Sequence, residues 1–599
     1  DEYTKMVEDG ANPVQLAKFW AMAESGKITG ADLFGLYRRF NMLSGPRTIE
    51  VNALSGATNL AYEVLSQAGG QLARGRKADA AAEFAAPFKA MRRAAGNLAE
   101  TMRHGVTTEQ AARGDIPRTL SSRTSNPVAK GVLTAMEMPD RFNAAVDQFF
   151  RTMTEDWAAT TLAHKQARAA GVTPRSPEWA ETVAKNLEAI RDDVDAFPEI
   201  KRMADHVTFS EEPGGIGRGL EEFRRRAPLV ANILFPFIRT PYNIASRAVD
   251  ISPLGVGRTG IEAAAGRGRG RENISRRVRD NALGLAVAYF AYDQAQQGNV
   301  TGAGPDDPEK QAMLRATGWQ PYSIKVGDRY WSYANFAPFS LALSLGAAAH
   351  EAKQYAKPGE TDTLALLGDA ATRTAKVVTD MTVLQGIGAV IKSIQDPDRY
   401  GGAWLTQFLS TLIPAGSLLN TVGQATDDAV RRSERDTFAN QVSQGVQARI
   451  PGLRQGVPAA QDPLGRTVPN EQQGAGALNP FRPTTRRDDP AIRAFLDAGV
   501  DIGKPKDKVT VVAGAAPIEL TPAEQRRWNE LRGAILVQNV PNVAGSQRYQ
   551  EAEKLARAKG LQTMLNAAAQ AADKQLIAEI GGDEIKRRLT GAIEKRRAS

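Results

Sequence analysis

The sequence predicts a protein that is almost entirely α-helical, and two observations carry that prediction. Apolar residues recur at intervals of three and four along several segments, as one face of an α-helix requires. Segments that alternate between apolar and polar residues, as half-buried strands do, are scarce. We therefore predict an elongated body of many helices, with at most one or two small β-hairpins and a long extended connector.

The helix signals appear early and are strongest between residues 139 and 198. The segment Thr29–Asp32 has the composition of a helix cap. Ser176 followed by Pro177 indicates an N-cap and a first helical residue, and this helix should end before Pro198. A further helix should open at Pro139, because apolar residues follow it at spacings of four, three, four and four: Phe142, Val146, Phe149, Met153 and Trp157.

Strand signals are confined to two short segments. Residues 322–331 alternate and contain a Gly-Asp pair, which predicts a small hairpin. Residues 508–512 form a second short candidate. They precede Thr521-Pro522-Ala523-Glu524, a capping box that predicts the start of another helix.

Two charge-free stretches are long enough to be compared with membrane-spanning helices, which need about 20 apolar residues. They cover residues 400–426 and 330–349, and Pro414 and Pro338 interrupt them. Helices buried in a large soluble body are the favoured interpretation, and association with a membrane is the alternative. The residues that would contact a membrane in that case are Trp404, Phe408, Leu412, Ile413, Leu418 and Leu419.

The pattern along the chain predicts five regions. Residues 445–490 hold seven prolines and six glycines without a periodic apolar pattern, which is typical of an extended connector. The regions are an N-terminal helical region (1–130), an amphipathic helical region (131–213), a central helical body (214–444), the Pro/Gly-rich connector (445–507) and a small C-terminal helical unit with a basic tail (508–599).

Composition excludes several kinds of chemistry. The 599 residues include no cysteine, so disulfides, cysteine-ligated zinc, iron–sulfur clusters and thiol catalysis are ruled out. The four histidines lie at least 42 residues apart along the chain, so no local metal motif exists. No phosphate-binding loop or nucleophile elbow is present, and the glycines at 266–270 follow an alanine-rich helix instead of a strand. We expect no catalytic residue, metal or cofactor.

The dipeptide at residues 24 and 25 is a weak catalytic signal. Glu24-Ser25 matches the dipeptide that opens the catalytic motif of lytic transglycosylases, in which the glutamate acts as a general acid. The Gly-Leu-Met-Gln-like segment that should follow is missing. We therefore rank peptidoglycan cleavage third among the functions considered.

Positive charge is concentrated in one window. Residues 215–280 contain thirteen arginines, no lysine and six acidic residues, which places +7 of the chain's formal +9 there. Arginine forks suit phosphate groups, so this window is predicted to contact a DNA backbone or an anionic lipid surface, with DNA slightly favoured. A solvated face or salt bridges between subunits is the alternative. The residues are Arg224, Arg225, Arg226, Arg267, Arg269, Arg271, Arg276, Arg277 and Arg279.

Several phrases occur in order between residues 40 and 530 that resemble those of one protein family. They are Leu43–Thr48 with Val51-Asn52, Asp147–Phe150, Phe235–Asn243, Ser252–Gly255, Gly318–Ser323, Tyr330–Tyr333, Pro338-Phe339, Pro451–Arg454 and Asp462–Arg466. The set is similar to the large internal virion, or ejection, proteins of short-tailed bacteriophages, which overlap the helical modules of phage large polyvalent proteins.

The resemblance implies a non-enzymatic helical body that is packaged in the capsid and released into the host envelope, where it helps to form an oligomeric conduit for the genome. Its implied partners are other ejection proteins, further copies of the chain, phage double-stranded DNA, the portal and tail channel, and the host inner membrane. Its implied location is the virion interior and then the host periplasm and inner membrane. The alternative is a packaged, non-enzymatic DNA-binding module that forms no channel.

Overall fold

The computed structural model describes residues 6, 10–16, 28–107, 119–174, 176–212, 215–226, 239–251, 270–336, 339–355, 397–434, 436–511 and 517–598. Contacts divide the chain into two compact units. Unit 1 comprises Asp1–Gly302 and Tyr333–Thr421, and unit 2 comprises Ala303–Ser332 and Val422–Ser599. The boundaries of these units differ from those of the five predicted regions. Residues 303–332, which lie within the predicted central body, belong to unit 2 together with the C-terminal part of the chain.

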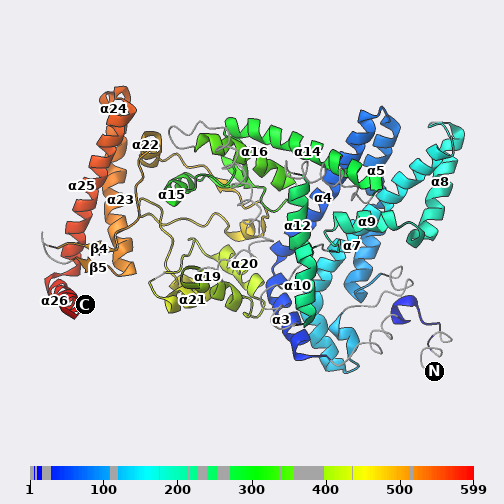
Figure 1. The fold of residues 1–599 in the computed structure, drawn as a ribbon. Helices are drawn as coiled ribbons and strands as arrows, with labels where there is room; N and C mark the ends of the chain where they lie inside the picture. The colour runs from blue at the N-terminus through cyan, green and yellow to red at the C-terminus, as the bar shows by residue number, and fades with distance from the viewer. Residues whose placement is uncertain are drawn as a thin grey trace. The chain divides into compact units, whose positions relative to one another are not determined.

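Unit 1 is built from helices, and the predicted all-α fold class is confirmed (Figure 1). In chain order its α-helices are α3 (Gly30–Leu43), α4 (Pro46–Ala73), α5 (Lys77–His104), α7 (Pro127–Ala169), α8 (Pro177–Asp192), α9 (Pro198–Val207), α10 (Gly215–Arg226), α12 (Arg239–Asp250), α14 (Gly270–Gln296), α16 (Phe339–Gln354), α19 (Pro397–Ser410) and α20 (Gly416–Thr426), whose end reaches unit 2. Two 3-10 turns, η1 (Leu120–Arg123) and η2 (Val194–Ala196), lie between them.

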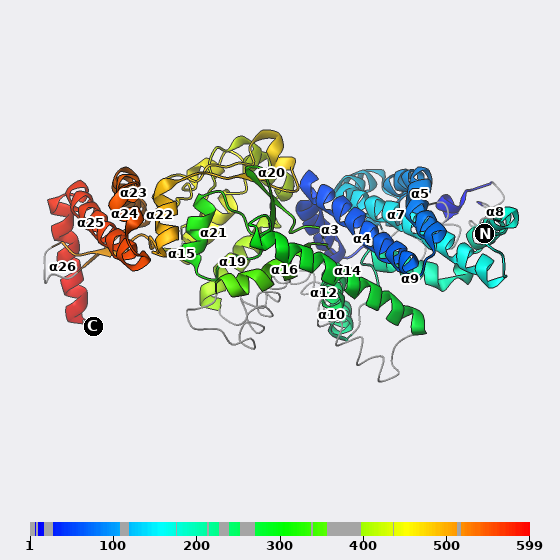
Figure 2. The same ribbon diagram turned by 90° about the horizontal axis from the view of Figure 1, so that it is seen from above.

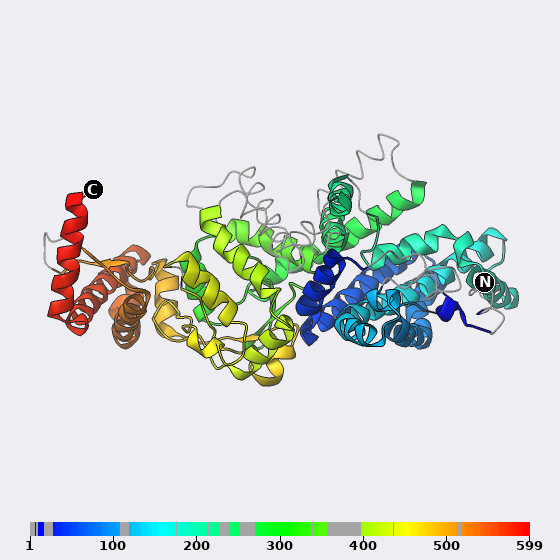
Figure 3. The same cartoon turned by 90° about the horizontal axis from the view of Figure 1, so that it is seen from below.

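The main core of unit 1 lies between α4, α5, α7 and α9. Trp157 is its largest fully buried side chain, and Phe150 and three alanines of α5 pack around it. The blue and cyan helices run alongside one another when seen from below (Figure 3). Ion pairs fix an antiparallel alignment of α5 and α7, because Arg93 pairs with Asp156 while Asp79 pairs with Arg168.

The predicted helix start at Pro139 is wrong, because α7 begins at Pro127 and runs through Pro139. The true start has a stronger signal: the Asn126 side chain accepts hydrogen bonds from the amides of residues 128 and 129. An interior proline costs a helix about 3 kcal/mol. The added turns offset that cost by burying Leu133 against Leu36 and Leu120.

The helices α14 and α16 lie side by side (Figure 2). A methyl group added at Gly346 would overlap the carbonyl oxygen of Ala288, so the two backbones meet there. Only glycine fits at position 346, because any side chain would collide with the backbone of α14.

The charge-free stretch 400–426 is two helices, since α19 ends at Ser410 and α20 begins at Gly416. The turn between them is held by α3. Asn41 donates to the Thr411 carbonyl at 3.0 Å and accepts from the Ala415 amide at 3.0 Å. Among the helices that the structure describes, none has the length and apolar character needed to cross a membrane.

Unit 2 contains seven of the helices and all the strands of the described part of the chain. Its α-helices are α15 (Pro308–Ala316), α21 (Phe438–Gln447), α22 (Pro490–Ala498), α23 (Pro522–Ala544), α24 (Gln547–Glu551), α25 (Lys554–Ile580) and α26 (Gly582–Ala598), and its 3-10 turns are η3 (Arg454–Gly456) and η4 (Gly474–Leu478). Its strands are β1 (Ser323–Val326), β2 (Arg329–Ser332), β3 (Thr484–Thr485), β4 (Lys508–Val509) and β5 (Ile518–Glu519).

The predicted hairpin at 322–331 is confirmed as β1 and β2, which pair antiparallel around Gly327 in the left-handed conformation. The connector adds β3 to the edge of this hairpin. The connector is also part of the unit's core, because Leu464 is buried among α15, α22, α23 and α25. The second predicted strand, 508–512, is confirmed only at its first two residues, which form β4 and pair with β5; residues 510 and 511 are not in a strand, and residue 512 lies outside the described residues.

Predicted helix caps at two positions are also confirmed. Thr29 and Asp32 form a reciprocal capping box at the start of α3, and Thr521 and Glu524 form another at the start of α23. The proline-led start of α8 at Pro177 is confirmed as well. These local signals act over three or four residues, so they are readable without knowing the tertiary fold.

Candidate functional site

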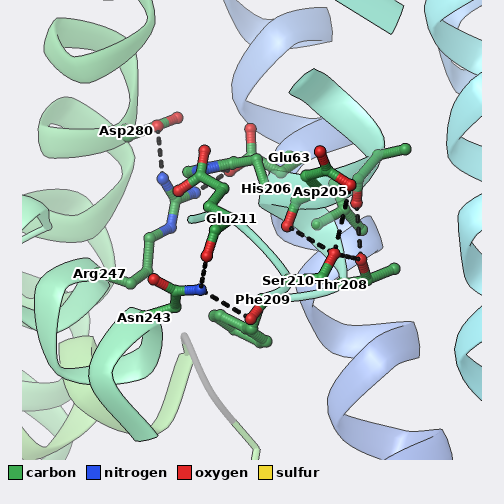
Figure 4. A network of polar contacts seen from close by, with 12 residues as sticks. Glu63, Asp205, His206, Thr208, Phe209, Ser210, Glu211, Asn243, Arg247 and Asp280 are labelled. Atoms are coloured by element: carbon green, nitrogen blue, oxygen red, sulfur yellow. Dashed lines mark hydrogen bonds and ion pairs between the residues drawn. The ribbon is translucent and has the colours of Figure 1, made fainter. Parts of the chain in front are cut away.

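Five charged or titratable side chains from separate segments of unit 1 meet in one cluster, here called the ion network (Figure 4). They are Glu63 of α4, His206 of α9, Glu211 beyond the end of α9, Arg247 of α12 and Asp280 of α14. Glu63 and Asp280 are fully buried, and Arg247 is 4% exposed. Charged side chains are seldom buried unless they are paired, so this cluster is a specific feature of the fold.

Arg247 occupies the centre of the ion network. Its Nη1 donates to Oδ2 of Asp280 at 2.9 Å, and its Nη2 donates to Oε1 of Glu63. Its guanidinium also lies over the Tyr62 ring, 5.4 Å from the ring centroid. A single cation thus bridges two carboxylates, those of Glu63 and Asp280, that lie more than 200 residues apart in the sequence.

His206 connects the ion network to a third carboxylate. Its Nε2 lies 3.2 Å from Oε1 of Glu63, and its Nδ1 lies 3.1 Å from Oε1 of Glu211. Burial opposes ionisation of Glu211, but the hydrogen bond to His206 and the nearby arginines outweigh it, so the pKa of Glu211 lies below its ordinary value. The arrangement therefore favours an ionised Glu211.

Asp280 is held in its charged form by the same kind of balance. Burial acts to raise the pKa of Asp280, yet the charge of Arg247 and the Ser66 hydroxyl, which donates to Oδ1 at 2.7 Å, bring the pKa below its usual range. The Tyr62 hydroxyl donates to the Asp280 carbonyl at 2.7 Å. Side chain and backbone of this residue are thus both tied to α4.

A tight backbone turn after α9 positions Glu211 beside His206 in the ion network. Phe209, two residues past the end of α9, has a φ of +53°, a conformation that non-glycine residues seldom adopt. The Asn243 side chain of α12 donates to the Phe209 carbonyl at 2.8 Å and to the Glu211 carbonyl at 2.9 Å. This amide holds the tight turn against α12 and fixes where Glu211 lies.

The ion network also has the residue types of a metal site. Ligand atoms of Glu63, His206 and Asp280 lie within 4.8 Å of one another. Arg247, however, already donates to both carboxylates, and a divalent cation between them would be placed against a guanidinium charge. We therefore assign these side chains to ion pairing, and their burial argues against direct contact with a substrate.

The arginines predicted to contact phosphate fall into two described groups. Arg225 and Arg226 are exposed on α10, and both pair with Glu222 of the same helix. Their outward position is compatible with binding an anion at the surface, because exposed pairs of this kind contribute little stability and exchange readily. The predicted contact itself stays a prediction.

The second group, on α14, lies closer to the protein interior. Arg276, Arg277 and Arg279 are half-buried. Burial lowers the pKa of Arg276, and repulsion by Arg247 adds to that effect. Burial also lowers the pKa of Arg279, whose aliphatic chain runs against Gly70 of α4. The side chains of Arg224 and Arg271, together with Arg267, Arg269 and Glu24, lie outside the part of the chain that is described.

The six apolar residues considered for membrane contact lie on α19, α20 and the turn between them. Trp404 stacks on Phe408 with ring centroids 5.7 Å apart, and Arg38 of α3 lies over the Phe408 ring. Five of the six are half-buried, and Leu418 is 41% exposed. Most of these side chains are therefore at least partly covered.

Larger exposed apolar faces occur on two other helices of unit 1. The first half of α7 exposes Val128, Val132, Met138 and Phe142. The helix α14 exposes Val278, Leu285, Tyr289 and Phe290. Single exposed apolar residues are normal, but rows of them on a helix mark surfaces that bind partners.

Comparison with known protein families, with curated proteins and with solved structures finds no match to this chain. The ion network was not predicted from the sequence, because its members are local neighbours only in the folded chain. Neither buried carboxylate stands out in the sequence, because polar residues lie at helical spacing from both: Asn59 and Ser66 from Glu63, and Arg276 and Arg277 from Asp280.

Proposed function

We propose that this chain is the helical body of a phage internal virion protein, packaged in the capsid and released into the host envelope, where it joins an oligomeric conduit for the genome. The proposal rests on the ordered phrases that resemble ejection proteins and on one structural observation. That observation is the pair of exposed apolar faces on α7 and α14, which a lone protein in water would leave unburied.

Three further features support the proposal. The absence of cysteine suits passage between reducing and oxidising compartments. The helices are separate elements, many of them led by proline, so they can unfold one at a time in a narrow channel. The close crossing at Gly346 is an instance of helix packing by small residues, which needs few bulky side chains.

Electron microscopy of the purified chain, alone and with the other internal proteins of its virion, tests the proposal. Closed rings or tubes are expected in the mixture. Single particles attached to added duplex DNA, without closed assemblies, would instead favour the packaged DNA-binding module. Zymography of the wild type beside Glu24→Gln checks the enzymatic alternative: clearing by the wild type that the variant loses would overturn the non-enzymatic assignment.

A further inference from the structure

The helix α5 has two apolar faces, and only one of them is covered. Its inner face packs on α7 and α4 through Ala86, Ala90 and Ala94. A second row lies on the outside, where Phe84, Phe88 and Met91 are 51%, 59% and 46% exposed. The ring centroids of Phe84 and Phe88 lie 6.0 Å apart, so the two aromatic side chains are direct neighbours on this face.

The spacing of this outer row is that of a coiled-coil seam. Its members follow one another at intervals of three, four, three and four, which are the a and d positions of a heptad repeat. Leu98 and Met102 continue the same register and are half-buried. The exposed members are Ala81, Phe84, Phe88, Met91 and Ala95, here called the outer row.

The outer row is narrow. Lys89, Arg92 and Gly96 lie on its open side, and the other side turns into the buried face that meets α7. Helices that lie in a membrane surface present a broad apolar face, whereas a row restricted to a and d positions fits the groove of a single partner helix. The width of the row therefore favours a helix over a lipid surface.

The exposed charges of α5 indicate which kind of partner helix the outer row would bind. Every exposed charged residue of α5 is a cation: Lys77, Lys89, Arg92 and Arg103. The acids Asp79 and Glu83 are buried, and Glu100 is half-buried. A second copy of α5 would set these cations against one another, while acidic residues beside an apolar seam would meet them.

We propose that the outer row of α5 is a docking surface for an acidic amphipathic helix of another protein, with apolar residues at its a and d positions and glutamate or aspartate beside them. The proposal goes beyond the conduit function, because it holds for any assembly that supplies such a helix.

The full-length chain is titrated into two fluorescent designed peptides. Both carry leucine at a and d, and they differ only in having glutamate or lysine at e and g. Anisotropy should show binding of the glutamate peptide at least tenfold tighter than that of the lysine peptide, with the preference shrinking as salt rises. Equal binding of both peptides, or of neither, would overturn the proposal.

Variants locate the surface. Phe84→Ser with Phe88→Ser should weaken binding of the glutamate peptide at least tenfold, whereas Leu72→Ser, at an exposed leucine of α4, should leave it unchanged. Lys89→Glu with Arg92→Glu should reverse the preference between the peptides. Circular dichroism of each variant confirms that the helices persist, which exposed positions permit, and failure of the charge reversal in a folded variant would refute the charge argument.

Two further measurements test the alternative occupants of the outer row, which are a membrane surface and a second copy of the chain. Flotation with vesicles of phosphatidylglycerol and phosphatidylcholine, lost in the Phe84 and Phe88 variant while neither peptide binds, would assign the row to a membrane. Self-association in light scattering that the same variant abolishes would assign it to a second copy. If the peptides show no preference and rings or tubes of the conduit still form, this proposal fails while the proposed function stands.

Discussion

At the scale of single residues, the ion network depends on Arg247. Arg247→Met removes the cation and leaves Glu63 and Asp280 buried without their partner, so we expect a loss of about 3–5 kcal/mol in the free energy of unfolding. Urea denaturation followed by circular dichroism measures it. Arg225→Gln, which breaks an exposed pair with Glu222, is the matched control and should change stability by less than about 0.5 kcal/mol.

Two further substitutions test whether Arg247→Met destabilises the protein by leaving carboxylates unpaired or by disturbing the packing. Adding Glu63→Gln and Asp280→Asn to the Arg247→Met variant removes the stranded charges, so part of the lost stability should return. If the triple variant is less stable than the wild type by the sum of the three separate effects, the three residues act independently and are not energetically coupled.

In unit 2, Asp427 is a carboxylate paired with arginines, and its contribution to stability should depend on pH. Hydrogen bonds from Arg431 lower the pKa of this carboxyl, burial opposes them, and Arg454 adds a further hydrogen bond at 2.6 Å. A carboxyl with a lowered folded-state pKa stabilises the protein above its unfolded pKa of about 3.9 and loses that contribution as pH falls through the folded value.

We therefore expect Asp427→Asn to be less stable than the wild type at pH 7, with a difference that shrinks as the pH is lowered from about 4 towards 2. Urea midpoints of both proteins across that range give the difference. A constant gap at every pH would mean that Asp427 contributes through packing and not through its charge.

At the scale of helices and strands, the sequence predicts those features that a few neighbouring residues determine. Capping boxes at Thr29 and Thr521 and the hairpin turn at Gly327 are each decided within a few residues, and each was predicted. The start of α7 was not, because packing of Leu133 overrides the proline at 139. The strand β3 was also missed, since two residues carry no alternation and pair only after the connector returns to β2.

The crossing of α14 and α16 gives a prediction at this scale. Gly346→Ala places a methyl group against the Ala288 carbonyl, so the helices must separate and we expect a loss of about 1–3 kcal/mol. Gly96→Ala is the control: this glycine is also inside a helix but has open space around it. Alanine there should stabilise by about 0.5–1 kcal/mol. Thermal unfolding of both variants should shift in opposite directions.

At the scale of the whole molecule, the two units have separate cores. Unit 1 is organised around Trp157, and unit 2 around Phe495 and Leu464. The excursion at 303–332 was assigned to the central body from the sequence, because nothing in its own residues shows that β2 will pair with β3. Partition of a chain into units depends on such distant pairings, which spacing along the sequence does not reveal.

Separate cores predict separate unfolding. We expect scanning calorimetry to resolve two transitions, because each core loses its packing as a unit of its own. Arg247→Met should lower the midpoint of only one transition, and Asp427→Asn should lower the midpoint of only the other. A single transition that both variants shift equally would show that the units fold as one.

The arginines predicted to bind DNA differ in how exposed they are. Arg225 and Arg226 are exposed, whereas Arg276 and Arg279 are half-buried beside acidic groups. If the first pair meets phosphates, Arg225→Gln with Arg226→Gln should reduce the slope of log affinity against log salt by about 1.8, from about 0.9 per contact.

Arg276→Gln with Arg279→Gln should instead lower thermal stability and leave the slope unchanged, because these side chains serve the interior of unit 1. Anisotropy with a labelled duplex at several salt concentrations measures the slope, and circular dichroism measures the melting temperature. Duplexes of different sequence should bind equally, since backbone contacts do not distinguish bases. A slope that the first double variant leaves intact would remove Arg225 and Arg226 from any DNA contact and leave the exposed apolar faces as the surfaces through which this chain assembles.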